Sequence, residues 1–192
     1  MTKDRILSAA KAVLEREGVD RLTIRKVAER ADLSPMALYR HFADKDALLN
    51  ALMEDGLAAW TSIVRGIRAR DPLDWLLALG EAHLDFALTQ PHRYDAAFFL
   101  PAPAARQFPD DFAAGRSPAI AMVIERIDQA KADGRLCDKP TLEIALALVA
   151  AGHGFVSMYR ANRFASEKQF KVLYRAANRH LLDLLKPSGN PK

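Results

Sequence analysis

Residues 22–42, which read LTIRKVAERADLSPMALYRHF, decide the fold. Thr23 and Ser34 are residue types that cap helix N-termini, and Pro35 follows Ser34 at the position where proline suits the first helical turn. We therefore expect one short helix from Thr23 to about Ala31 and a second that begins at Pro35. Two short helices separated by about three residues are typical of a helix-turn-helix.

The apolar residues of this segment have the spacing of a small helix-turn-helix core. Ala28 lies where the two helices should cross closely, so a larger side chain there would force them apart. The residues expected to converge are Val27, Ala28, Ala31, Leu33, Leu38 and Phe42. The outward residues of the second helix are Met36, Ala37, Tyr39, Arg40 and His41. A surface that combines Met and Tyr with two potentially cationic groups suits insertion into a DNA major groove.

Helical periodicity continues on both sides of this segment. An apolar stripe precedes it at Ile6, Ala9, Ala10, Val13 and Leu14, and Gly18 should end that helix. Downstream helix starts are predicted at Asp44, Asp71-Pro72, Ser117-Pro118 and the capping box Ser166–Gln169, with breaks at Pro91 and Gly134 and a long loop over 101–117. No strand alternation is visible, so we expect an all-α protein of about nine helices.

Composition excludes several classes of protein. The 192 residues are 50% hydrophobic and 27% charged, which is enough apolar surface for a packed core. A single cysteine, Cys137, excludes a disulfide framework and a cysteine-rich zinc site. No signal-peptide core is visible, and the longest uncharged stretch, Ile144–Tyr159, is shorter than the roughly 18 to 20 residues of a membrane helix. We expect a cytoplasmic protein that has no contact with a membrane.

The run from Leu22 to Leu49 resembles the TetR family of bacterial repressors, and the resemblance covers roughly residues 3–50. It implies a helix-turn-helix DNA-binding domain at 1–48 and a helical ligand-binding and dimerisation domain at 49–186. The tail at 187–192 is expected to be disordered. The segments Gln90–Tyr94 and Ala151–Gly154 are similar to the subgroup named after a Trp-His-Gly motif, although the Trp position holds Ala or Gly here.

The resemblance assigns DNA contacts to ten residues: Thr23, Arg25, Ser34, Pro35, Met36, Ala37, Tyr39, Arg40, His41 and Lys45. Thr23, Tyr39, His41 and Lys45 match positions that bind the phosphate backbone, and such contacts position a protein without reading sequence. Base reading is expected from Arg25, whose planar fork suits guanine, and from Pro35, Met36, Ala37 and Arg40. The family usually has Gly where this chain has Asp32, so we expect slight strain in the turn.

The second domain shows no catalytic motif, and we expect neither an enzyme nor a cofactor. His83 with Asp85 and His92 with Asp95 lack further ligands at metal spacing, so no metal site is expected. The resemblance implies a ligand cavity, whose expected lining is Phe86, Tyr94, Phe98, Phe99, Met122, His153 and Tyr159. For any one of them the alternative is a place in the core, and His153 in particular can be a satisfied core histidine.

The last two predicted helices, about 139–162 and 167–185, have the residue patterns that favour association with another helix pair. The expected contact faces are Ala145, Leu148, Ala151, Gly152 and Phe155 on the first, and Leu173, Ala177, His180, Leu181 and Leu184 on the second. In the family such helices pair with their copies in a homodimer. The alternative is packing within one chain, which some of these residues must also do. Residues 160–192 hold eight basic and two acidic residues, against ten and eight over 1–48, and we interpret this C-terminal excess as a solvated face.

These patterns favour a ligand-responsive transcriptional regulator. We expect a repressor that binds a palindromic operator in double-stranded DNA as a homodimer and is released by a small, mostly apolar molecule. A constitutive or architectural DNA-binding protein without a ligand is the main alternative. A helical enzyme that carries the DNA-binding module is a third possibility, and the absence of converging acid, base and nucleophile motifs weighs against it.

Overall fold

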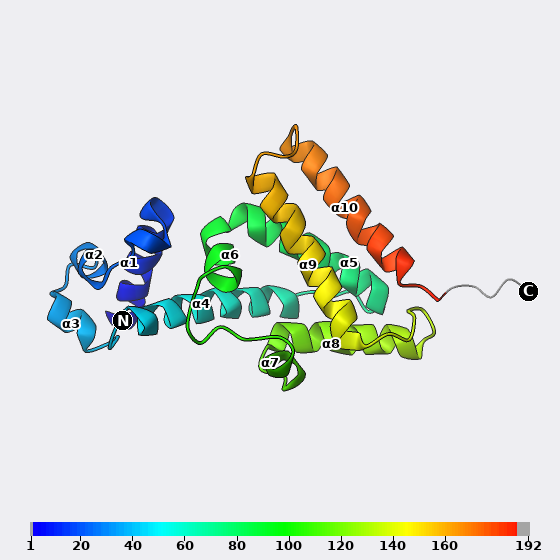
Figure 1. The fold of residues 1–192 in the computed structure, drawn as a ribbon, viewed down its shortest axis with the longest axis horizontal. Coiled ribbons are helices and arrows are strands. Elements are labelled where there is room, and N and C mark those ends of the chain that lie inside the picture. Colours follow the sequence, from blue (N-terminus) through cyan, green and yellow to red (C-terminus); the bar gives the residue numbers. More distant parts are fainter. Residues whose placement is uncertain (1, 188–192) are drawn as a thin grey trace, which may run out of the picture. The chain divides into compact units, whose positions relative to one another are not determined.

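The computed structural model describes residues 2–187 and is helical throughout, with no strand in that range. Figure 1 shows the elements in chain order. They are α1 (Thr2–Glu17), the 3-10 turn η1 (Val19–Arg21), α2 (Ile24–Arg30), α3 (Pro35–Tyr39), α4 (Lys45–Arg65), α5 (Pro72–Thr89), α6 (Pro91–Phe98), α7 (Asp110–Ala113), α8 (Pro118–Ala132), α9 (Thr141–Arg160) and α10 (Glu167–Leu184). The predicted all-α class is confirmed.

Most of the predicted helix starts are built as the sequence indicates. Thr23 Oγ1 accepts the Lys26 amide at 3.3 Å, and Ser34 Oγ accepts the Ala37 amide at 3.1 Å. Asp44 caps α4 through the Ala47 amide at 2.7 Å. At α10, Ser166 Oγ accepts the Gln169 amide at 3.2 Å, while the Gln169 side chain returns to the amide of Ala165. These short-range contacts satisfy amides that the first turn of a helix leaves unpaired.

Two local expectations were wrong. Ser117 precedes Pro118 at the start of α8, but its side chain makes no capping hydrogen bond, so proline alone marks that start. The segment 101–117 is not entirely loop, because it contains the four-residue helix α7. An ion pair between Asp111 and Arg116 at 2.6 Å closes this short helix, and Asp111 also accepts the Gln107 amide at 2.8 Å.

The chain forms two compact units. The first comprises residues 1–60 and 90–105, and the second comprises 61–89 and 106–192. α4 begins in the first unit and ends in the second, while α6 belongs to the first unit together with the helix-turn-helix. The predicted division at residue 48 separates a DNA-binding domain from a ligand-binding domain. The two compact units do not identify the residues that contact DNA or ligand, so this division stays a prediction. Of the predicted disordered tail 187–192, only Pro187 lies within the described residues.

The core of the first unit is the one expected for the helix-turn-helix. Val27, Ala28 and Leu38 are fully buried, Ala31 and Phe42 nearly so, and Leu33 packs against them while partly exposed. The turn closes through the Leu33 amide, which donates to Ala28 O at 2.9 Å. Asp32 has φ 51, in the left-handed region that favours glycine, which is the strain the sequence predicts at this position.

The second unit packs α5 against α8, α9 and α10. Its interior includes Trp75, Phe86, Ile127, Phe170 and Tyr174, all of which are almost completely buried. α9 is 20 residues long and apolar enough to span a membrane by length and composition alone, which corrects the expectation that this stretch is too short. Only 22% of its most apolar window is buried within the chain, so α9 keeps an uncovered apolar face.

Candidate nucleic-acid interface and ligand site

The candidate nucleic-acid interface is the surface of α3 and the residues that follow it. Leu38 anchors α3 in the core, and this orientation leaves Met36 69% exposed and Tyr39 49% exposed. The predicted residues Pro35, Arg40 and His41 are also exposed, and Ala37 is half-buried. Arg40 and His41 lie directly after the last residue of α3 rather than within it. The structure therefore brings the predicted outward residues of the second helix onto one exposed segment.

The phosphate-binding residues predicted outside α3 lie at helix starts. Thr23 and Ser34 are exposed and already cap α2 and α3 through their hydroxyl oxygens, which leaves their O–H groups able to donate. Lys45 begins α4, where the helix dipole adds positive charge. Its Nζ lies 3.5 Å from Val19 O of η1, so the ammonium group is held close to the helix-turn-helix.

Two cationic residues on α2 have different surroundings. Lys26 is ion-paired with Glu17 of α1, and this contact joins the ends of two helices. The Lys26 ammonium group lowers the pKa of the Glu17 carboxyl, which therefore stays ionised. Arg25 is exposed on the same helix. Arg25 is therefore more accessible to an anionic or base partner than Lys26 is, and Arg30 at the end of α2 is exposed as well.

The residues predicted to line a ligand cavity do not form one group. Tyr94, Phe98 and Phe99 belong to the first unit, where the Tyr94 and Phe98 rings are 5.0 Å apart and Phe98 meets Trp60 edge-on. Phe86, Met122, His153 and Tyr159 belong to the second unit. Phe86 and Tyr94 are fully buried, as core residues are, and Phe99 is 51% exposed. The seven residues remain a predicted lining.

His153 forms part of a polar chain in the second unit, in which His83 is buried and His153 is half-buried. His83 Nδ1 lies 2.9 Å from the Tyr174 hydroxyl, and His83 Nε2 lies 3.3 Å from His153 Nδ1. Gly152 makes room for this chain, since a Cβ there would lie 3.2 Å from the His83 ring. Burial lowers the pKa of His83 to about 3, with a smaller contribution from His153, and lowers that of His153 to about 4. Both imidazoles are therefore neutral at pH 7.

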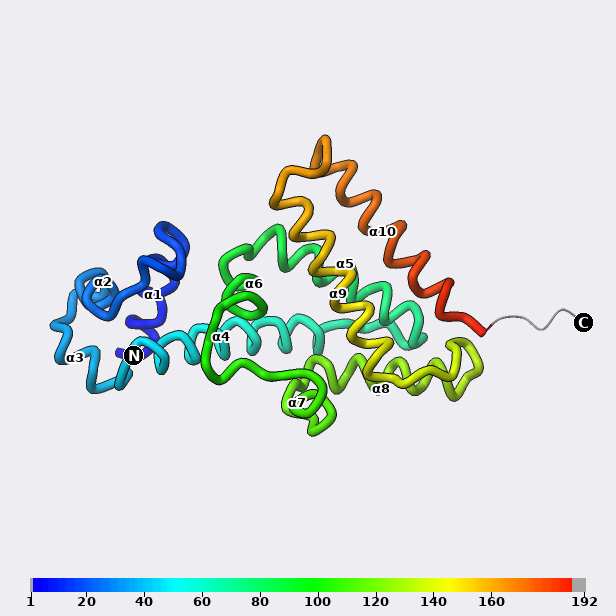
Figure 2. Tube along the Cα trace, in the orientation of Figure 1, coloured from blue at the N-terminus to red at the C-terminus, as the bar shows by residue number. Residues whose placement is uncertain are grey.

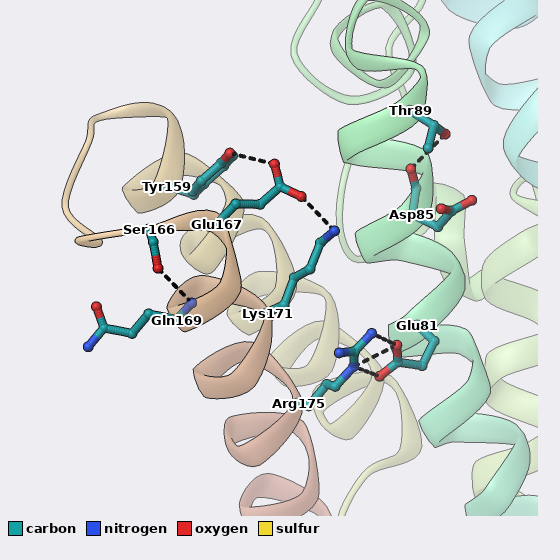
Figure 3. A network of polar contacts seen from close by, with 9 residues as sticks. All are labelled: Glu81, Asp85, Thr89, Tyr159, Ser166, Glu167, Gln169, Lys171 and Arg175. Carbon is teal, nitrogen blue, oxygen red and sulfur yellow. Dashed lines mark hydrogen bonds and ion pairs between the residues drawn. The ribbon is translucent and has the colours of Figure 1, made fainter.

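An open groove of about 500 Å³ lies between α5 and α10, and its lining differs from the predicted set. Figure 3 shows its polar side chains. Arg175 binds Glu81 through a bidentate contact at 2.8–2.9 Å, and Glu167 accepts from Lys171 at 2.6 Å and from the Tyr159 hydroxyl at 3.3 Å. The pair between Arg175 and Glu81 neutralises part of the C-terminal basic excess, because Glu81 is supplied by α5.

The predicted association helices expose apolar side chains, but the face predicted on α9 is wrong. Ala145 and Gly152 are buried inside the chain, where Gly152 contacts His83. The exposed face of α9 is offset around the helix and consists of Leu146, Ala147, Ala150, Gly154, Ser157 and Met158. On α10 the predicted Leu173 and Leu184 are exposed, by 44% and 82%, and Val172 is exposed beside them.

Within residues 2–187, no group of three or more His, Cys, Asp or Glu side chains is arranged to hold a metal ion. The capped two-helix motif, its exposed surface and the all-helical second unit define a helix-turn-helix DNA-binding regulator. The sequence comparisons identify its family. Residues 6–52 match bacterial regulatory proteins of the tetR family, and residues 76–182 match the tetracyclin repressor-like C-terminal domain. The chain belongs to the TetR family of transcriptional regulators, which are DNA-binding proteins and not enzymes.

Two curated relatives illustrate this similarity. The chain is 51% identical to the class A tetracycline repressor of Escherichia coli over 53 residues, which are 28% of this chain and 24% of that protein. It is 31% identical to an HTH-type transcriptional regulator of Mycobacterium tuberculosis over 159 residues, which are 81% of this chain and 69% of that protein. The match thus spans about a quarter of the class A repressor.

Solved structures share the fold along the whole chain. A protein of unknown function from Rhodococcus sp. RHA1 is 25% identical with a TM-score of 0.80, over 97% of this chain and 96% of that one. A tetR family transcription regulator from Shewanella sp. PV-4 has a TM-score of 0.69 at 22% identity, over 95% and 96% of the two chains. The Trp-His-Gly subgroup expected from Gln90–Tyr94 and Ala151–Gly154 is not confirmed.

Proposed function

We propose that this TetR-family regulator is a homodimeric repressor that binds a palindromic operator in the cytoplasm and is released by a small, mostly apolar effector. The observation that carries the proposal is the exposed segment of α3, where Met36 and Tyr39 project from a helix held by buried Leu38. Exposed apolar and aromatic side chains beside cations suit methyl and phosphate contacts in a major groove. One such segment contacts one half-site, so a palindrome requires a second copy.

The exposed faces of α9 and α10 support the dimer. Large contiguous apolar patches are uncommon on monomeric soluble proteins and mark interaction sites. Figure 1 shows the two helices side by side, joined by a short turn. A second copy that adds its own α9 and α10 would complete a four-helix bundle across a two-fold axis.

α4 supports coupling between an effector and DNA. It begins at Lys45, whose ammonium group lies by the helix-turn-helix, and it continues into the second unit after Trp60. An effector that binds better when α4 is displaced shifts the dimer toward a half-site spacing that no longer fits successive major grooves. Reciprocity requires that operator DNA weakens effector binding by the same factor.

Replacing Arg25 or Lys45 should separate base reading from phosphate binding. Arg25→Ala should cost about 1 to 3 kcal/mol of operator binding and relax the preference at one base pair in each half-site. Lys45→Ala should weaken binding to all sequences alike and reduce the salt slope by about one unit. Fluorescence anisotropy on a panel of single-base operator variants measures both. An unchanged base preference in Arg25→Ala would refute the assignment.

The effector is expected to be neutral or at most singly charged. The predicted lining consists of five aromatic residues, one thioether (Met122) and His153, whose imidazole is neutral at pH 7. Several desolvated anionic charges would therefore have no partner there. Candidates found by thermal-shift screening should bind the free protein more tightly than the operator complex. Equal affinities in calorimetric titrations with and without operator would exclude a candidate as an inducer, and selection of polyanionic metabolites would contradict the predicted pocket.

A further inference from the structure

The first unit contains an ionic contact that the helix-turn-helix motif does not include. Asp55 on α4 lies between two cations, with Lys11 Nζ of α1 at 2.6 Å and Arg93 Nε of α6 at 3.7 Å from its Oδ2 atom. This oxygen is buried and makes no hydrogen bond of good geometry. A buried carboxylate oxygen is costly unless it is compensated, so its position depends on both cations. We call Lys11, Asp55 and Arg93 the ionic bracket.

The residue beside Asp55 fixes α6 on α4 by backbone packing. A Cβ at Gly56 would lie 2.7 Å from Ala97 N and 2.9 Å from Arg93 O, so the two helices touch where Gly56 has no side chain. Because the backbones of α4 and α6 are this close at Gly56, a sideways shift of α6 would break their contact. Gly56 and the ionic bracket therefore locate α6 at the same turn of α4.

The chain after α6 is tied to α4 a second time. Asn50 Oδ1 accepts the Ala104 amide at 2.9 Å, and Figure 2 shows the segment after α6 passing along α4. Residues 90–105 consequently belong to the same compact unit as α1–α3. Lys11 lies on α1 between Ala10 and Val13, which are buried in the core that holds α2 and α3.

We infer that Asp55 is a positioning residue for operator recognition, which holds α1 and its helix-turn-helix in register with α4 and α6. Asp55 is not one of the predicted DNA-contacting residues, so it would act on the proposed operator binding through Lys11 and Arg93. Partly exposed ion pairs contribute little to global stability, and the side chains here are 25%, 28% and 46% exposed. The contact should therefore affect the alignment of the reading surface more than the melting temperature.

The test compares Asp55→Asn and Arg93→Gln with the control Glu15→Gln, which removes the same charge as Asp55→Asn from an exposed position of α1 in the same unit. In the free protein, hydrogen exchange of the α6 amides should rise about fivefold in both bracket variants and stay unchanged in the control. Affinity for a duplex selected from a randomised pool should fall about fivefold or more, whereas affinity for an unrelated duplex should change less than about twofold.

The readouts distinguish positioning from a structural role. General destabilisation would weaken both duplexes alike, and this result would overturn the inference. Equal hydrogen exchange of the α6 amides and equal duplex selectivity in Asp55→Asn, Glu15→Gln and the unmodified chain would overturn it as well. Arg93→Gln keeps the contact between Lys11 and Asp55 and removes only the contact between Asp55 and α6. It therefore tests the attachment of α6 even if Asp55→Asn folds poorly. Failure of the unmodified chain to select any duplex would count against operator binding itself, while the α6 exchange comparison would still decide whether the bracket holds α6.

Discussion

Gly154→Arg should convert the protein into a folded monomer that has lost about a hundredfold or more of its operator affinity. Nothing lies within 4 Å of a Cβ built at Gly154, so the chain itself can accept a long side chain there. Arginine also favours a helix more than glycine does. If a second copy packs on this face of α9, the guanidinium group must be buried in the interface or must separate the two copies. Loss of the dimer turns two linked half-site contacts into one.

Sedimentation velocity gives the oligomeric state, and anisotropy with a two-half-site duplex gives the affinity. Ala132→Arg is the matched control, because it adds the same charge at an exposed position of α8 outside the proposed interface. Leu184→Glu provides an independent test on α10, since its side chain is 82% exposed in the single chain. If Gly154→Arg remains a dimer with unchanged operator affinity, the two copies do not meet through this face.

The two glycines of α9 show what a single sequence leaves undetermined. Gly152 and Gly154 are both small residues in an uncharged stretch, so periodicity alone cannot say which one faces the interior. The answer depends on His83, whose ring occupies the space next to Gly152, and His83 is distant in the sequence. The face predicted on α9 was therefore rotated from the face that the fold exposes.

Local signals were more reliable than long-range ones. The caps at Thr23 and Ser34, the core position of Ala28 and the strained turn at Asp32 are all determined by contacts within a few residues. The ionic bracket was missed because its three residues are separated by long segments and only the packing of α6 on α4 unites them. Aromatic content alone does not separate pocket from core, because large rings at helical spacing are often buried in the core, as Phe86 and Tyr94 are.

Acidification should destabilise the protein through the buried histidines. His83 and His153 have pKa values of about 3 and about 4 in the folded chain, against 6.5 for an ordinary histidine, and burial is the main cause for both. Below pH 6.5 the unfolded chain binds protons that the folded chain cannot accept. The stabilising contribution is therefore complete above pH 6.5 and is lost as the pH falls toward 4. At pH 5 each of the two imidazoles should lower the free energy of unfolding by about 2 kcal/mol relative to its value at pH 7.5.

Urea unfolding between pH 7.5 and pH 5, at one fixed protein concentration, measures this loss. His153→Gln should remove about half of the pH dependence, because it deletes one of the two buried bases and leaves the His83–Tyr174 contact at 2.9 Å available. His92→Gln is the matched control, since His92 is exposed on α6, and its pH dependence should equal that of the unmodified chain. The slope of the unfolding free energy against pH is the decisive quantity, because a variant can lower stability equally at every pH without a change in proton binding. A slope unchanged in His153→Gln would mean that other groups carry the acid sensitivity and that the histidine chain accepts protons without unfolding.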